Sequence, residues 1–267
     1  MEIAHQNADR FSKFADFYDQ VRPALPLEVR SILLQYLGHQ PSVLVDIGCG
    51  TGLSTAGWSG YAANIIGVEP SDAMLSIAQN RTASDSSIRY IHAFSDQTGL
   101  PDDSADLVTC SQSFHWMNPD KTIPEIARVL KTGGIFSAFD CDWPPVCHWE
   151  AEKAYEELFD VLHRMHAENH KTKDRYKHWD KNKHLENLKK SGKFRYVREV
   201  LFSQTEETDA ERFIGLAWSQ GDLQSLLEAG VEEAQSFYDT FEKKVHQAMG
   251  TKRYPIRFGY RMRLAVK

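Results

Sequence analysis

The chain has 267 residues, of which 42% are hydrophobic and 25% are charged, and its formal net charge is -6. These values are typical of a soluble globular protein with one large domain, or with a core domain and a sizeable insertion. An acidic chain lacks the basic surface of a nucleic-acid-binding domain, so we do not expect nucleic acid as a partner. The four cysteines are scattered, no stretch is apolar over the ~18 residues of a membrane span, and the first residues lack a secretory pattern. We therefore expect a cytoplasmic protein with reduced thiols, no membrane contact and no metal site.

The N-terminal segment is expected to be helical. The aromatic residues between positions 11 and 18 have helical spacing, Pro23 and Pro26 interrupt it, and the residues from Leu27 to Leu37 predict a second, amphipathic helix. We interpret residues 1–40 as an N-terminal helical cap.

A strand followed by a glycine-rich turn comes next. The stretch from Val43 reads V-L-V-D-I-G-C-G-T-G, and its apolar beginning suits a strand buried on both faces. Three alternate glycines let the chain turn sharply and bring bare backbone against a ligand. A helix from Leu53 to Trp58 would point its first N–H groups into that turn. This geometry holds the nucleoside half of a cofactor at the carboxyl end of a first strand.

The glycine spacing and the preceding acid indicate the kind of cofactor. A dinucleotide-binding turn reads G-x-G-x-x-G, whereas this chain has G-x-G-x-G with Asp46 two residues before the first glycine. Asp46 would repel a pyrophosphate but would suit a positively charged ligand. An ordinary tight turn between a strand and a helix is the alternative interpretation.

The motif D-I-G-C-G-T-G resembles the first motif of the class I S-adenosylmethionine (SAM)-dependent methyltransferases. In that family the glycine turn packs against the methionine part of SAM, and the acid orients it through water or through the amino group. The resemblance implies that SAM is the cofactor and that Asp46 contributes to its site.

An acid also ends the second predicted strand, which runs from Asn64 to Glu69. Its distance from the glycine turn is close to the ~20 residues expected before the carboxylate that accepts the two ribose hydroxyls. Pro70 follows at the cofactor edge, and Ser71 is the expected N-cap of a helix over residues 73–80.

The third predicted strand covers Ile88–Ala93. In the resembled family an acid that binds the adenine amino group commonly follows it, but this chain has Phe94 at that position. Either Phe94 packs on the adenine face while the N–H of Ser95 reads a ring nitrogen, or Asp96 reaches back. We prefer the first arrangement.

The fourth predicted strand, Ala105–Cys110, leads into Ser111 and the sequence F-H-W. The N-P-P-Y motif of methyltransferases acting on nucleic-acid bases is absent here. The F-H-W element and the earlier segment from Tyr18 to Arg22 resemble the trans-aconitate methyltransferase group instead. That resemblance implies that Tyr18 and Arg22 close over the cofactor, with Arg22 able to bind a carboxylate. In the alternative interpretation, Tyr18 belongs to the core and Arg22 to the surface. His115 is a candidate general base because its unperturbed pKa lies near neutrality. The alternative is that His115 and Trp116 are packing residues that shape the pocket floor, because methyl transfer often needs only alignment.

A helix over 122–130, a turn over 131–134 and a fifth strand over 135–139 complete the predicted core. Helices follow over 149–190, then a strand over 194–202, helices over 209–218 and 222–249, and a final strand over 255–266. The region from 163 to 198 is rich in Lys, Arg and His, which indicates a solvated face or a mouth that attracts anionic substrates.

The predicted fold is an α/β, Rossmann-like, seven-stranded, mostly parallel sheet with strand order 3-2-1-4-5-7-6, an antiparallel last strand and helical lid insertions. One methyltransferase domain would span 1–267, with a SAM-binding core at 41–141 and helical lid or substrate insertions at 142–192 and 205–250. The oligomeric state stays open.

The predicted function is transfer of the SAM methyl group to a small-molecule acceptor, with a carboxylate as one candidate. A SAM-binding sensor or scaffold, an RNA or protein methyltransferase and a nicotinamide oxidoreductase are the alternatives. The expected cofactor-binding residues are Asp46, Gly48, Cys49, Gly50, Gly52, Glu69, Pro70, Phe94, Ser95 and Ser111. The expected substrate-binding residues are Tyr18, Arg22, His115, Trp116 and Trp218, with Trp218 also a candidate for the core of the lid.

Overall fold

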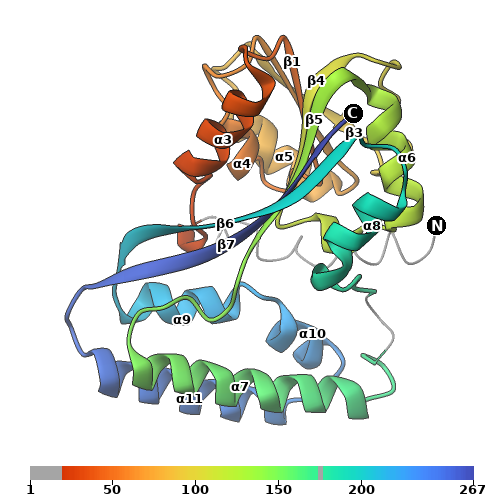
Figure 1. Ribbon diagram of the computed structural model, residues 1–267. Helices are drawn as coiled ribbons and strands as arrows, with labels where there is room; N and C mark the ends of the chain where they lie inside the picture. Colours follow the sequence, from red (N-terminus) through yellow and green to blue (C-terminus); the bar gives the residue numbers. More distant parts are fainter. Residues whose placement is uncertain (1–19, 174–176) are drawn as a thin grey trace.

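The computed structural model describes residues 20–173 and 177–267, and a seven-stranded sheet runs through them (Figure 1). Its strand order is β3-β2-β1-β4-β5-β7-β6, and β7 is antiparallel to both of its neighbours while the first five strands pair in parallel. The predicted topology is therefore confirmed. The strands are β1 (Val43–Ile47), β2 (Asn64–Glu69), β3 (Ile88–His92), β4 (Ala105–Ser111), β5 (Leu130–Cys141), β6 (Tyr196–Thr208) and β7 (Tyr254–Val266).

Helices cover both faces of the sheet because its central strands are apolar on both sides. On one face, α3 (Leu27–Leu37) inserts Val29 and Leu33 against Leu44 and Leu107. On the other face, α6 (Pro119–Val129) packs against β1, β4 and β5, and α8 (His184–Lys190) lies beside α6 against β6 and β7. Two short elements complete this part, α4 (Leu53–Ala56) and α5 (Asp72–Arg81).

Helix starts are set by side chains that the sequence makes recognisable. Ser71 caps α5, as predicted, by accepting the N–H of Met74 at 3.5 Å. Asn118 caps α6 by accepting the N–H of Asp120 at 3.0 Å, and Pro119 occupies the first helical position, where no N–H is needed.

A layer of helices lies beyond the carboxyl ends of the parallel strands (Figure 1). It contains α7 (Trp149–Glu168), α9 (Ala210–Trp218), α10 (Asp222–Glu228) and α11 (Glu233–Met249). Tyr155, Phe213 and Phe241 form an aromatic core between these helices, and Phe258 of β7 joins it from the sheet. The long antiparallel pair of β6 and β7 thus links the sheet to the helical layer.

Three elements differ from the expectation. The strand expected to end at Phe202 continues to Thr208, because β6 pairs with β7 along its whole length. The fifth strand begins at Leu130 rather than Ile135, because Leu130 already pairs with Ala105 before a bulge.

The third difference is the helix expected over 222–249, which is two helices. Gly230 has a φ of 83°, and the N–H of Val231 bonds back to the carbonyl of Leu226 at 3.0 Å. This left-handed ending closes α10 before α11 begins. Over 149–190, where helices are expected, the structure has α7 and α8, with the short 3-10 helix η2 (Lys181–Lys183) before α8.

Candidate functional site

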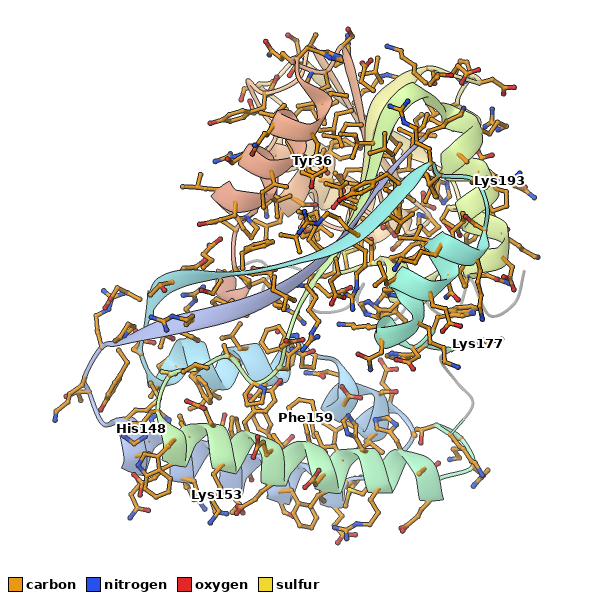
Figure 2. All side chains as sticks on the ribbon, in the orientation of Figure 1. Tyr36, His148, Lys153, Phe159, Lys177 and Lys193 are labelled. Atoms are coloured by element: carbon orange, nitrogen blue, oxygen red, sulfur yellow. The ribbon has the colours of Figure 1, made fainter. Side chains whose placement is uncertain are left out.

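A cavity of ≈ 850 Å³ lies between the sheet and the helical layer. The carboxyl ends of β1, β2, β4 and β5 contribute to its wall, which is where open parallel sheets bind ligands. The opposite wall comes from α7, the segment that leads into η2, and the loop after α9. Figure 2 shows Phe159 on the side of α7 that faces the sheet and Lys153 on the opposite side.

The glycine turn forms the floor of the cavity at the end of β1. The N–H groups of Gly48 and Cys49 bond to the carbonyl of Val68 at 2.7 and 3.2 Å, which ties the turn to β2. Gly48 has a φ of 68°, and a Cβ there would lie 2.6 Å from Cε of Met117. Gly50 has a φ of 55°, and a Cβ there would meet no atom within 4 Å. The chain therefore passes closely under Met117 and leaves open space beside Gly50.

Asp46 does not line this cavity, because its carboxylate is used inside the protein. It is fully buried and accepts hydrogen bonds from the hydroxyls of Ser54 (2.6 Å), Thr55 (2.7 Å) and Thr109 (2.9 Å). Burial raises the pKa of Asp46, while these three hydrogen bonds lower it. Asp46 thus fastens the start of α4 to β1 and β4 and supports the turn from below.

Gly52, the third glycine of the motif, is also absent from the cavity wall. It has a φ of 77°, and a Cβ there would lie 2.6 Å from the hydroxyl oxygen of Tyr90 and 3.0 Å from Cβ of Ala78. Its place in the motif is explained by the packing of the turn against α5.

Glu69 lies at the cavity edge at the end of β2 and is held by two backbone N–H groups. Its Oε2 accepts from Gly50 and its Oε1 accepts from Ser71, both at 3.0 Å. Burial raises the pKa of Glu69 to about 7, although these two hydrogen bonds and the nearby His92 act in the opposite direction. One carboxylate therefore braces the glycine turn and the start of α5 together.

The other expected cofactor residues, Cys49, Pro70, Phe94, Ser95 and Ser111, all line the cavity. Phe94 is half-buried, and the hydroxyl of Ser95 shares a 2.9 Å hydrogen bond with Thr122 of α6. Asp96 lines the cavity as well, so both arrangements that were considered around Phe94 remain available.

The expected substrate residues fall into three groups. Arg22, His115 and Trp116 line the cavity. Tyr18 lies outside the described residues, and Trp218 packs against the helical core instead of lining the cavity. Trp218 is partly buried near the C-terminal end of α9 among the helices of that layer, which agrees with its other interpretation as a residue of the lid core.

Arg22 joins the segment before α3 to the helical layer. Its Nε donates to Oγ of Ser219 and its Nη2 to the carbonyl of Ser219, both at 2.9 Å. Its guanidinium carbon lies 4.9 Å from the centre of the Trp143 ring. The cation is therefore fixed in place at the cavity wall by a buried serine and an aromatic face.

His115 lies in the 3-10 helix η1 (Phe114–Trp116), between β4 and α6. Its Nδ1 is 3.1 Å from Oδ1 of Asp140, and the side chains of both residues are less than 10% exposed. Burial lowers the pKa of His115, although the hydrogen bond and the charge of Asp140 act in the opposite direction. The imidazole is therefore neutral at neutral pH.

Sequence reasoning missed Asp140 and several aromatic residues of the wall. An acid inside the apolar run F-S-A-F-D-C was a usable signal, because a buried carboxylate needs partners. Trp143, Tyr155 and Phe159 come from the start of the helical layer and from α7, and Lys181 comes from η2. Their arrival at the cavity depends on helix packing, which no local pattern reveals.

Within residues 20–173 and 177–267, no three His, Cys, Asp or Glu side chains are grouped as metal ligands. In the same described part of the chain, every helix is too short or too polar to cross a bilayer.

Comparison with known proteins identifies the central part of this chain. A family model described as "Methyltransferase domain" matches residues 45–138. The chain is 35% identical over 124 residues to the probable S-adenosylmethionine-dependent methyltransferase CRG1 of Saccharomyces cerevisiae, which corresponds to 45% of this chain. The match covers 43% of CRG1, so the chain spans less than half the length of this relative.

Two solved structures share the fold over nearly the whole chain. A putative type II methyltransferase from Anaeromyxobacter dehalogenans has a TM-score of 0.66 at 19% identity, with 92% of this chain and 97% of that chain covered. The [4+2]-cyclase SpnF has a TM-score of 0.59 at 18% identity, with 99% and 96% covered. At these identities the likeness concerns the fold alone. The sequence match therefore shows a methyltransferase domain at residues 45–138, and the two structures show that the chain as a whole has their fold.

Proposed function

We propose that this protein transfers the methyl group of SAM to a small-molecule acceptor that carries a carboxylate. The observation that supports this proposal is the division of a single cavity into two chemically different halves. One half contains the glycine turn and the buried carboxylate of Glu69, and the other contains aromatic rings and cationic side chains.

The first half fits the nucleoside and the methionine part of SAM. Glu69 keeps lone pairs beyond those used by Gly50 and Ser71, and an ionised carboxylate can accept both ribose hydroxyls. Gly50 leaves room for a ligand against the backbone, and Phe94 offers an apolar face for the adenine. Bound SAM would supply an electrophilic methyl group on a sulfonium.

The second half fits an acceptor with an apolar body and a negative group. Trp116, Trp143 and Tyr155 provide flat apolar surface. Arg22, Lys177 and Lys181 place positive charge at the wall, and Asp222 is the acid on this side. Because a guanidinium binds a carboxylate through parallel hydrogen bonds, Arg22 is the residue we assign to the acceptor anion.

The finer resemblance to the trans-aconitate methyltransferase group is part of this proposal. The two segments that carry it, around Arg22 and around F-H-W, are far apart in sequence but both line the cavity. Methyl transfer needs the acceptor in line with the sulfonium, and positioning of this kind contributes roughly 7–11 kcal/mol to lowering a barrier. Fixed walls on either side of the transfer point supply such positioning.

The test is an acceptor screen that uses wild-type protein and Arg22→Gln. Small carboxylic acids and their neutral amides are incubated with SAM, and S-adenosylhomocysteine (SAH) formation is measured by mass spectrometry. We expect turnover of an acid but not of its amide, and a raised KM for the acid in Arg22→Gln. Equal turnover of acid and amide would contradict the proposal that the acceptor is recognised by its carboxylate. Tight SAH binding with no turnover of any acceptor would favour the SAM-binding sensor or scaffold.

A further inference from the structure

We propose that Asp140 is a positioning residue that fixes His115 with its proton on Nδ1, so that Nε2 accepts the proton of an acceptor hydroxyl. The inference rests on the proposed function and specifies its reacting atom. The acceptor would be a hydroxyl compound that carries a carboxylate, and the product would be a methyl ether rather than a methyl ester.

The geometry holds the imidazole from two sides. Nδ1 of His115 lies 3.1 Å from Oδ1 of Asp140 at the end of β5. The carbonyl of His115 accepts the N–H of Trp179 at 2.8 Å, which fastens η1 to the segment before η2. Since Nδ1 is used by Asp140 and the ring lines the cavity, Nε2 is the nitrogen that remains for a ligand.

Asp140 stays ionised although it is buried, and this decides which nitrogen carries the proton. Burial raises the pKa of Asp140, but the hydrogen bond with His115 and the charge of Lys181 outweigh it and hold the pKa well below its usual range. Nζ of Lys181 lies 3.4 Å from Oδ1, and Nη1 of Arg263 lies 3.8 Å from Oδ2. A carboxylate can only accept, so the proton of a neutral His115 belongs on Nδ1.

The charges around His115 also keep it neutral. Lys181 and Arg22 lower the pKa of His115 in addition to burial, and Asp140 opposes them. His178 lies with its ring centre 6.1 Å away, and the buried His184 interacts with the same cluster. The base is therefore ready at neutral pH, when a free hydroxyl is still protonated.

The step balances without a further reactant. The hydroxyl proton passes to Nε2 as the oxygen lone pair bonds to the methyl carbon, and the carbon–sulfur bond breaks with its electron pair going to sulfur. His115 then returns the proton to solvent, and Asp140 stays ionised throughout. A carboxylate oxygen would need no base, because it is already anionic at this pH. The built base therefore points to a hydroxyl as the nucleophile.

If Asp140 only stabilised the fold, its replacement would not change which nitrogen of His115 carries the proton. The test therefore measures the tautomer of His115. In the ligand-free protein, ¹⁵N NMR of the histidine rings at neutral pH distinguishes a proton on Nδ1 from one on Nε2. We expect the proton on Nδ1 in the wild type and a shift toward Nε2 in Asp140→Asn. The same tautomer in both proteins, or a proton on Nε2 in the wild type, would overturn the proposal.

Kinetics and product chemistry complete the test. We expect Asp140→Asn to lower kcat by about 10²–10⁴-fold, the range of a general base, with the KM for SAM and the affinity for SAH unchanged. Asp142→Asn is the matched control, because Asp142 is an exposed acid near the same strand end that pairs with Arg261 at 3.1 Å. It should behave as the wild type.

The product formed by the wild type also tests whether the nucleophile is a hydroxyl, even if Asp140→Asn fails to fold. A methyl ether that resists mild alkali supports the proposal, and a methyl ester that alkali cleaves overturns it. The rate should rise with pH and reach its upper plateau at a pH below 6.5, because the pKa of His115 is lowered. Loss of this rise in His115→Gln would support His115 as the general base. SAH binding without any methylated product would contradict the proposed function. The NMR measurement would still test whether Asp140 sets the tautomer of His115.

Discussion

At the scale of single residues, Glu69 gives the cofactor half of the cavity a measurable pH dependence. Its pKa is raised by burial from 4.5 to about 7, so between these values the folded protein binds more protons than the unfolded chain. Stability of the ligand-free protein is therefore lost as the pH rises through this window, by up to about 3 kcal/mol.

Urea unfolding at pH 5 and pH 8 measures this difference. Glu69→Gln has no charge to bury, so we expect its free energy of unfolding to change less between the two pH values than that of the wild type. Equal changes in the two proteins would show that another group carries the pH dependence.

Two glycines of the turn have different roles: Gly50 leaves space for a ligand, and Gly52 allows close packing inside the protein. In Gly50→Ala, the left-handed backbone costs about 1–2 kcal/mol, but the methyl group meets no neighbour and projects into the cavity region. We expect a folded protein with weakened SAH binding. In Gly52→Ala, the methyl group also collides with Ala78 and Tyr90, which adds about 1–3 kcal/mol.

Urea unfolding and SAH calorimetry on both variants check this contrast. Gly52→Ala should lose more stability than Gly50→Ala. If Gly50→Ala binds SAH as the wild type does, the ligand does not approach the backbone there.

Prediction from sequence worked for residues that belong to a motif and failed for residues that depend on packing. Glu69 was identifiable because its spacing from the glycines is set by one strand and one helix. Asp46 was identifiable as a motif member, but its three hydroxyl partners come from α4 and β4, and its place under the turn became visible only in the fold. Asp140 was missed because its partner His115 is 25 residues away.

At the scale of elements, α7 carries part of the acceptor wall and depends on α11 for its position. Phe241 of α11 is 2% exposed, and its ring centre lies 6.3 Å from that of Tyr155 on α7. We expect Phe241→Ala to lower the free energy of unfolding by about 3–5 kcal/mol. Because Tyr155 and Phe159 line the cavity, the KM for the acceptor should rise while SAH affinity is kept.

The matched control is Glu157→Gln, on the same pair of helices. Glu157 binds Lys244 at 2.6 Å, but both side chains are about half exposed, and exposed ion pairs add little to stability. Urea unfolding should not separate this variant from the wild type. A weakened SAH affinity in Phe241→Ala would show that the two halves of the cavity are coupled.

Element boundaries were predictable where burial and pattern coincide. β1, β2 and β4 are buried apolar runs, and they appear close to the expected positions. β6 extends further than expected, because an edge strand with polar alternation resembles a loop in sequence. The break between α10 and α11 lies at Gly230, which has a left-handed backbone, in a region whose helical spacing otherwise continues.

At the scale of the whole molecule, the strand order could be predicted from the alternation of strands and helices along the chain. The position of the helical layer could not be predicted in this way. Parallel strands with intervening helices admit few arrangements, and the motif at the first strand selects the order that the structure shows. In sequence, α7 lies between β5 and β6, and α9, α10 and α11 lie between β6 and β7, so no local pattern places these helices over the cavity. The net charge of -6 likewise hides a cationic acceptor wall, since total charge says nothing about its distribution.

The central claim is that the cavity between the glycine turn and Glu69 binds SAM, and calorimetry with SAH tests it most directly. The wild type should bind one SAH per chain and give no heat with NADH. Glu69→Gln should bind SAH at least about tenfold more weakly, equivalent to about 1.4 kcal/mol, because its amide replaces one acceptor oxygen by a donor and cannot accept both ribose hydroxyls. No binding of SAH by the wild type, or binding of NADH in its place, would contradict the account.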